Sequence, residues 1–477
     1  MLIKWVEDKS KTAKVIWLHG TAGIGKSAVA QHISERYAAK GGLAATFFFS
    51  RNDPTRDKLD PFVASIAYQF LREGSALRAK LGPTITEAIL KDPKIFDASY
   101  EKQLKKLILG PCLELESTLQ DDLPSLLVID GLDECVDHAS QERAVGLIRS
   151  LLACYSPLLW TILVCSRPER QIRDAFRHPA FDGVLWSLDM NSMEDLNRDI
   201  ERYFIDQFAA LREKHRNILK REGRSWPGGH VVDELVRRAD KQMIFAATVI
   251  KYIDTYDELP QDRLATILRI RIDGAMDSPY SALDALYSQI LSTCAHQWHK
   301  LHFILRLLVT PHYCPVDLKR FDHDIAWRSP ATIALFCNLK KGEVRIFLDK
   351  LHSVLRIPRH GADKKDKNVY IAHASFTEFM VDPERSRDFH TPRMTNSEYS
   401  DCLATFSLRV VSSITRRYPP YYRQSQSFTE ALLDWDQEYQ KDHADLSFSI
   451  QGWALFTDVS APRSELSMRC PRLIAIL

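Results

Sequence analysis

Residues 14–27 of the chain have the sequence KVIWLHGTAGIGKS. Its second half, GTAGIGKS, fits the pattern G-x-x-x-x-G-K-[ST], in which a glycine-rich loop binds phosphates. A strand-like apolar run, residues 14–19, precedes the loop, and a helix-like segment, residues 27–39, follows it. Because the pattern is meaningful only between a strand and a helix, this context favours a phosphate-binding loop over a glycine turn that binds no nucleotide.

The residue types in this loop explain its chemistry. Glycines let the backbone close around phosphates, so that successive amides point inward beside the positive end of the following helix. We expect Lys26 to reach the β- and γ-phosphates and the Ser27 hydroxyl to bind Mg²⁺. The expected nucleotide-contacting residues are Gly20, Thr21, Ala22, Gly23, Ile24, Gly25, Lys26, Ser27 and Ala28.

A second acidic motif lies in residues 125–135, SLLVIDGLDEC. Asp130 ends an apolar strand, where a carboxylate is placed to bind Mg²⁺ beside the phosphate loop. An ordinary acid at a strand end is the alternative for Asp130 taken alone, and the upstream phosphate loop disfavours it. Asp133 and Glu134 follow on a turn, and either carboxylate would serve as the base that polarises an attacking water.

Five apolar runs predict the fold class of the first part of the chain. Hydrophobicity that is continuous rather than alternating is typical of parallel strands buried on both faces. Helix-like segments lie between the runs, so we expect a doubly wound, mostly parallel, five-stranded α/β domain. The five runs are residues 14–19, 43–50, 125–130, 161–165 and 183–188.

The pattern changes near residue 190. Residues 193–222 and 231–256 are predicted as amphipathic helices, and residues 368–372 as a strand after a charged turn at 361–367. We therefore expect four parts: a nucleotide-binding domain, a helical domain, a winged-helix-like domain, and a helical tail that is cut short. Their predicted bounds are residues 1–190, 191–310, 311–385 and 386–477.

The composition of the chain indicates which classes of partner and which cellular compartment to expect. A formal net charge of +2 does not indicate a nucleic-acid or membrane-surface partner. The longest apolar run, residues 151–165, is shorter than the about 20 residues that a membrane span needs. The 9 cysteines include no C-x-x-C pair, which favours a reducing compartment, the cytoplasm.

Together, the phosphate loop and the DGLDE sequence after an apolar strand resemble the NACHT domain of the STAND class of signalling NTPases. The likeness is greatest to fungal NACHT proteins and covers roughly residues 12–385. Segments similar to those proteins occur in the same order along the chain: residues 43–51 (LAATFFFSR), 161–168 (TILVCSRP), 351–355 (LHSVL) and 373–379 (HASFTEF).

The resemblance assigns roles to two further residues. Arg167 would be a sensor arginine that faces the γ-phosphate, with a surface arginine as the alternative. His373 would be the nucleotide-sensing histidine that holds the diphosphate form shut, with a structural histidine as the alternative. Residues 239–248 resemble the family pattern A-x-G-L-F-x-x-A-A-T but depart from it at residues 241–243 (KQM). Arg51 is left without a role.

The implied function is an ATP/ADP-operated signalling switch with slow Mg²⁺-dependent hydrolysis, in which the triphosphate form self-associates. Lys26, Asp133, Glu134 and Arg167 would carry the hydrolysis. One charged hydrogen bond is worth about 1.5–3 kcal/mol, whereas a switch from 1:99 to 99:1 needs about 5.5 kcal/mol. Several contacts must therefore act together, or a ligand must help.

Three other functions are weighed against this one. A small-molecule kinase would need an arginine-rich lid, and no lid-like segment occurs. A GTPase would need a guanine-binding N-K-x-D sequence, which is missing, so adenine is favoured although some relatives are thought to use GTP. A nucleotide-binding scaffold that scarcely hydrolyses stays open. About 13 residues precede the first strand, so separate effector and sensor proteins complete the system or the chain is a fragment.

Overall fold

The computed structural model describes residues 1–402 except 9, 52, 54, 116–122, 154–159, 221, 224, 256, 271–279, 311–327, 338, 340–341, 359–367, 396 and 400. The chain divides into two compact units, Met1–Ile250 and Lys251–Leu477. Most of the predicted tail, 386–477, and the charged turn at 361–367 lie outside the described residues. In the described part, no helix combines the length and the apolar character needed to cross a bilayer.

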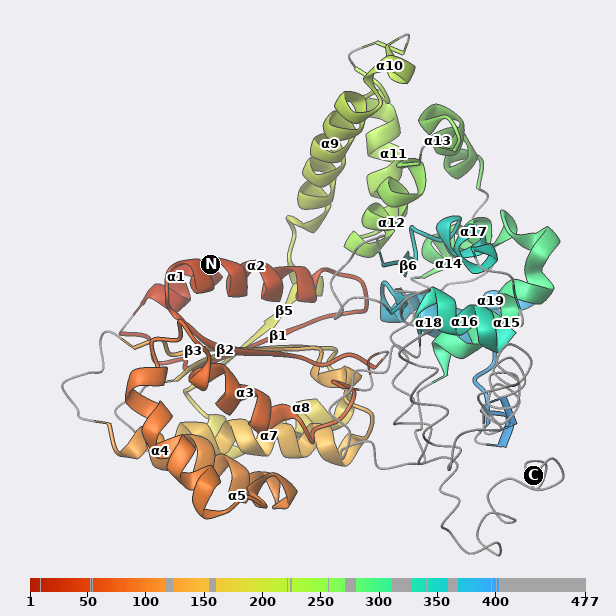
Figure 1. Cartoon of the computed structure of the whole chain (residues 1–477). Helices are drawn as coiled ribbons and strands as arrows, with labels where there is room; N and C mark the ends of the chain where they lie inside the picture. Colours follow the sequence, from red (N-terminus) through yellow and green to blue (C-terminus); the bar gives the residue numbers. More distant parts are fainter. Residues whose placement is uncertain are drawn as a thin grey trace, which may run out of the picture. The chain divides into compact units, whose positions relative to one another are not determined.

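A five-stranded sheet forms the centre of the first unit (Figure 1). The strand order is β2-β3-β4-β1-β5, and every pairing is parallel. Each strand lies within two residues of its predicted run, so the α/β class and the five strands are confirmed. The strands are β1 (Val15–His19), β2 (Leu43–Phe48), β3 (Leu126–Asp130), β4 (Thr161–Ser166) and β5 (Leu185–Asp189).

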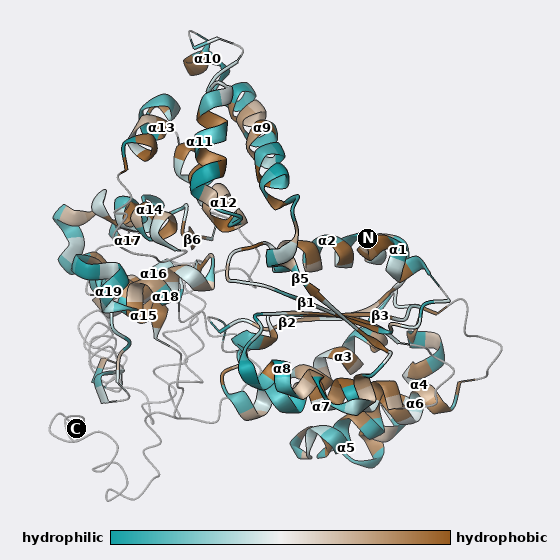
Figure 2. Cartoon of the chain, turned by 180° about the vertical axis from the view of Figure 1, so that it is seen from behind, coloured by the Kyte–Doolittle hydropathy of each residue, from teal (hydrophilic) through white to brown (hydrophobic). Residues whose placement is uncertain are grey.

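The inner strands are apolar along most of their length because both faces of the sheet are covered (Figure 2). In β1, Val15 and Trp17 join one hydrophobic cluster, and Ile16 and Leu18 join the other. Successive side chains point to opposite faces of a strand, so a strand buried on both sides needs no polar alternation.

Helices form the two outer layers of this unit (Figure 1). The cluster on one face includes residues of α1 (Leu2–Glu7) and α2 (Lys26–Ala39). The cluster on the other face draws on a larger helical set: α3 (Phe62–Leu71), α4 (Arg78–Lys91), α5 (Tyr100–Leu104), α6 (Gly110–Leu113), α7 (His138–Ala153) and α8 (Arg170–Phe176).

After the sheet, each of the two predicted helices is divided into two shorter helices. The segment 193–222 contains α9 (Leu196–Lys214) and α10 (Arg216–Leu219), which are separated at His215. The single helix expected over 231–256 is wrong: α11 (Gly229–Ala239) and α12 (Met243–Ile253) are separate. Asp240 and Lys241 adopt left-handed φ values of 42° and 63°, which a continuing right-handed helix does not allow.

In its described residues, the second unit is mainly helical with one small antiparallel pair, β6 (Leu355–Arg356) and β7 (Tyr370–Ile371). β7 lies within the strand predicted at 368–372. The buried Tyr287 ring packs at 5.0 Å from Phe376 and 5.4 Å from Phe379. The helices of this unit are α13 (Pro260–Arg269), α14 (Ser281–Ser292), α15 (Trp298–Val309), α16 (Pro330–Cys337), α17 (Glu343–Asp349), α18 (Ala374–Val381) and α19 (Pro383–Ser386).

Candidate functional site

The strand order brings the predicted site residues of the first unit to one edge of the sheet. β4 lies between β1 and β3, with His19 paired to Ser166 and Asp130 paired to Cys165. The carboxyl ends of parallel strands lie at the same edge, where α/β proteins bind their ligands. The phosphate loop, the acidic turn and Arg167 therefore leave the sheet side by side.

The loop after β1 has the conformation that its glycines permit. Gly23 and Gly25 have φ values of 79° and 110°, which favour glycine. The Lys26 ammonium donates to the Gly20 and Thr21 carbonyl oxygens, each at 2.8 Å. Lys26 also begins α2, so the helix dipole adds to its positive charge. Burial lowers the pKa of this ammonium, and nearby Asp133 opposes that shift.

Asp130 and Ser27 meet beside this loop. Asp130 is 5% exposed, and the Ser27 side chain lies close enough to lower the pKa of its carboxyl. Burial raises the pKa of Asp130 to about 6. A carboxylate and a hydroxyl oxygen next to a phosphate loop are hard ligands that suit Mg²⁺ with several waters. The residues present thus fit the metal site that the sequence predicts.

Asp133 is fixed by Arg167. One carboxylate oxygen accepts from the Arg167 backbone N–H at 2.9 Å, and the other lies 3.2 Å from the Arg167 Nε. Asp133 is 5% exposed, and Gln141 donates to its carbonyl oxygen at 3.2 Å. The predicted sensor arginine is therefore engaged with the acidic turn in this conformation.

Glu134 has a different environment from Asp133. Its Oε2 accepts from the Arg51 backbone N–H at 3.1 Å. Burial and, after it, the charge of the neighbouring Asp133 raise the pKa of Glu134 to about 7. Its protonation therefore changes near neutral pH, in the range that suits a general base.

Residues later in the chain, which no sequence motif indicated, also contact the phosphate loop. Asn191, just after β5, accepts from the Thr21 hydroxyl at 3.0 Å, and Lys241 donates to the Asn191 carbonyl at 3.0 Å. The Ile244 backbone N–H donates to the Gly23 carbonyl at 3.0 Å. A Cβ on Gly23 would lie 2.3 Å from the Ile244 side chain, so this glycine is required for packing. Of these three residues, only Asn191 could have been predicted from the sequence to lie near the loop, because it directly follows a predicted strand of the same sheet.

His373 belongs to the second unit. It is the N-cap of α18: its Nδ1 accepts from the Ser375 backbone N–H at 3.1 Å and lies 2.7 Å from the Ser375 hydroxyl. A ring nitrogen that accepts from an amide carries no proton, so the proton of the neutral ring is on Nε2. The Ser375 hydroxyl also bonds the buried Tyr287 hydroxyl at 2.8 Å. A structural role as a cap is thus present, whatever the role of Nε2.

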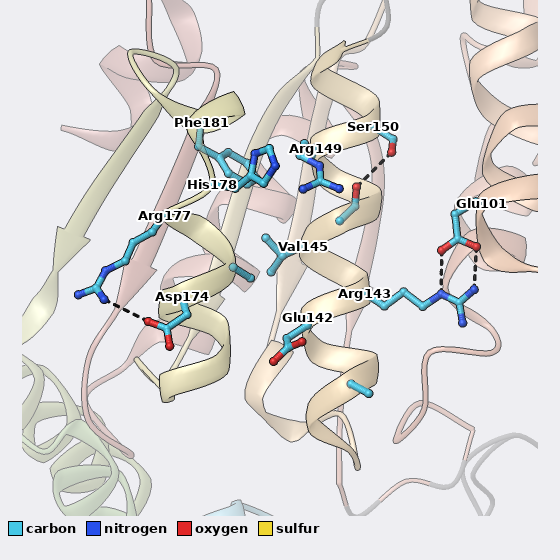
Figure 3. Close-up of a pocket in the computed structure, with 13 residues that line it drawn as sticks. Glu101, Glu142, Arg143, Val145, Arg149, Ser150, Asp174, Arg177, His178 and Phe181 are labelled. Carbon is cyan, nitrogen blue, oxygen red and sulfur yellow. Dashed lines mark hydrogen bonds and ion pairs between the residues drawn. The ribbon is translucent and has the colours of Figure 1, made fainter.

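A groove of about 570 Å³ lies along α7 and α8 in the first unit (Figure 3). Its lining includes none of the predicted site residues. Arg143 forms a bidentate pair with Glu101, both bonds at 2.7 Å, and Arg177 pairs with Asp174 at 3.1 Å. Because these charges neutralise each other within the lining, the groove does not compete with the strand-end site as the place for a polyphosphate.

Comparison with known proteins bears on the first part of the chain. No curated protein matches the sequence. Residues 2–167 match the family model described as Nephrocystin 3, N-terminal, a range that includes the phosphate loop, the acidic turn and Arg167. Over that range the chain is similar to this family.

Proposed function

We propose that this protein is a nucleotide-operated switch that binds ATP or ADP with Mg²⁺ and hydrolyses the triphosphate slowly. The observation that carries the proposal is that the Ser27 side chain and the Lys26 ammonium both lie close enough to the buried Asp130 carboxyl to lower its pKa. A cation for the phosphates and two oxygen ligands for a metal, brought together from distant parts of the sequence, make up a nucleotide site.

Each residue has a distinct task in the proposed reaction. Lys26 exchanges its carbonyl partners on the loop for phosphate oxygens, and Ser27 and Asp130 would hold the metal. Mg²⁺, when bound, supplies charge that offsets the charge on the phosphates. Arg167 leaves or shares its contact with Asp133 to face the γ-phosphate. The low exposure of Asp130 and Asp133 keeps water away from these charges and strengthens their interactions.

Of the two acids on the turn, we assign the base to Glu134. Both oxygens of Asp133 are engaged by Arg167, so neither is free to accept a proton from an attacking water. Glu134 has a pKa of about 7 and is paired with an uncharged backbone amide. In this assignment Asp133 orients Arg167, and Glu134 accepts the proton of the attacking water.

The signalling part of the proposal rests on the resemblance to fungal NACHT proteins. There the diphosphate form is the closed state, and the triphosphate form self-associates. The residues that would report the nucleotide are Arg167 in the first unit and His373 in the second. Separate effector and sensor proteins would act on this switch in the cytoplasm.

The test is the nucleotide that the purified protein carries, identified by mass spectrometry after denaturation. We expect ADP or ATP in the wild type and a loss of at least about tenfold in Lys26→Ala, because one charged hydrogen bond is worth about 1.5–3 kcal/mol. Lys40→Ala is the control, since Lys40 lies at the other end of α2 in a surface pair with Glu7. A wild type that neither carries nor binds ATP, ADP or GTP contradicts the proposal.

A further inference from the structure

The turn that carries the two acids packs against the loop that follows β2. β2 and β3 are neighbours, with Phe48 paired to Asp130. Beyond the strands, the Phe49 N–H donates to the Asp130 carbonyl at 2.9 Å, and the Val136 N–H donates to the Asp57 carbonyl at 2.8 Å. The two loops thus stay hydrogen-bonded to each other after the sheet ends.

Gly131 shows how close this approach is. Its φ is 69°, and a Cβ at this position would lie 2.9 Å from the Phe49 carbonyl oxygen. Such a contact is too short for any side chain. The start of the acidic turn is therefore pressed against the backbone of the β2 loop, and residues of that loop determine where the acids lie.

Arg51 makes the contacts that reach both acids. Its backbone N–H donates to Glu134 Oε2 at 3.1 Å, and its guanidinium Nη2 donates to the Asp133 carbonyl oxygen at 2.8 Å. One contact holds a side chain and the other holds the backbone between the two carboxylates.

The strand order places an arginine on each side of the acidic turn. In the order β2-β3-β4, Arg51 follows one neighbour of β3, and Arg167 follows the other. Arg167 holds the Asp133 carboxylate, while Arg51 holds the Asp133 carbonyl and, through its amide, Glu134. The acidic turn is thus fixed between arginines on two sides, and the Arg51 guanidinium contacts the backbone of the turn at the Asp133 carbonyl oxygen.

We propose that Arg51 is a positioning residue that holds the Asp133–Glu134 turn in its hydrolytically competent geometry. The inference rests on the proposed function, because it concerns the same hydrolysis. It assigns Arg51 to the chemical step and not to nucleotide affinity, since its contacts are with the acidic turn and not with the phosphate loop. Displacing a base by about 1 Å is enough to slow a reaction strongly.

The test compares Arg51→Ala and Arg51→Lys with the wild type, with ADP affinity and single-turnover ATP hydrolysis measured on each protein. Arg51→Ala loses the guanidinium contact with the Asp133 carbonyl and keeps the backbone amide that bonds Glu134. We expect it to hydrolyse about tenfold more slowly, a part of the about hundredfold or more that a positioned base contributes. Its ADP affinity should stay within about twofold of the wild-type value, because a contact that acts only in the transition state changes the rate and not the binding of the nucleotide. Arg51→Lys keeps a cationic donor and should recover part of the rate. Arg56→Ala is the matched control, because Arg56 lies in the same loop, is about half exposed and pairs with Asp53.

The outcomes separate this inference from the proposed function. A wild type that hydrolyses ATP while Arg51→Ala keeps the full rate overturns only the role of Arg51. A fall in rate accompanied by an equal loss of ADP affinity also overturns it, because that pattern indicates general damage to the site. If Arg51→Ala does not fold, Arg51→Met takes its place, because methionine keeps much of the aliphatic length and has no donor; a full rate or an equal loss of ADP affinity in that variant decides against the role in the same way. A wild type that binds no nucleotide overturns both.

Discussion

Glu134, at the scale of single residues, shares its surroundings with Asp133 and Asp130, and only part of this negative charge is matched by cations. Burial is the main cause of its raised pKa, ahead of repulsion from Asp133. The same burial governs Asp130, with a pKa of about 6. When buried carboxyls with raised pKa values ionise, they lower the stability of the nucleotide-free protein. This loss of stability has a function if the Asp130 carboxylate binds a metal and the Glu134 carboxylate takes part in the reaction.

Because charging the buried Glu134 is unfavourable, we expect Glu134→Gln to stabilise the nucleotide-free protein. The Glu134 pKa is about 7 in the folded chain against 4.5 ordinarily, so the folded state binds the proton more tightly. The cost of charging the carboxylate grows as pH rises from about 4.5 to about 7 and is complete above that. Glutamine keeps an oxygen to accept from the Arg51 amide and removes the charge.

We expect a gain of about 1–3 kcal/mol at pH 8 that shrinks toward pH 5, measured by denaturant unfolding in EDTA. Glu142→Gln is the control, an exposed glutamate on the neighbouring helix α7, and should change stability little at either pH. A Glu134→Gln protein that is less stable at pH 8 would show that hydrogen bonding, and not burial, dominates this carboxylate.

The corner between α11 and α12 decides, at the scale of elements, how the helical segment meets the phosphate loop. Lys241 occupies the place where the pattern A-x-G-L-F has glycine, and its φ of 63° is one that glycine adopts without strain. Position 241 thus differs from the pattern in its residue type, but its backbone has a conformation that the glycine of the pattern would adopt. What the lysine adds is its bond to the Asn191 carbonyl.

Substitution at Lys241 separates these two effects. Lys241→Gly and Lys241→Ala both lose the ammonium, but only glycine accepts the left-handed conformation without cost. We therefore expect the alanine variant to be less stable than the glycine variant by about 1 kcal/mol, from their denaturant unfolding midpoints. Equal stability, or a more stable alanine variant, would mean that the two helices join into one, as the sequence pattern alone predicts.

The elements differ in how far local sequence determines them. The five strands were predictable because burial on both faces leaves continuous apolar runs. The break at residues 240–242 was not, since neither glycine nor proline is present there and the cause is a distant contact, the Ile244 amide with the Gly23 carbonyl. Lys26, Ser27 and Asp130 could be brought together from their motifs. The engagement of Asp133 and Glu134 by Arg167 and Arg51 could not, because it depends on the order β2-β3-β4, which no local pattern encodes.

The switch proposal, at the scale of the whole molecule, requires that the second compact unit responds to the nucleotide bound in the first. One charged hydrogen bond is worth about 1.5–3 kcal/mol, less than the about 5.5 kcal/mol of a complete switch. His373 can therefore contribute only part of the response. Its share is measurable as a rate of ADP release, provided that its capping of α18 is kept apart from any contact with the nucleotide.

Two substitutions at His373 make that separation. Leucine removes both the imidazole and the cap, whereas asparagine is a good N-cap that keeps an acceptor for the Ser375 amide. If the imidazole holds the diphosphate, both variants should release ADP faster by about 10- to 100-fold in stopped flow, since about 1.4 kcal/mol is a factor of ten. His299→Leu, at an exposed position of α15, should release ADP like the wild type. If only His373→Leu releases ADP faster, the cap explains the effect. His373 would then be a structural residue of the second unit, and the sensing of the diphosphate would have to come from the arginine and lysine of the first.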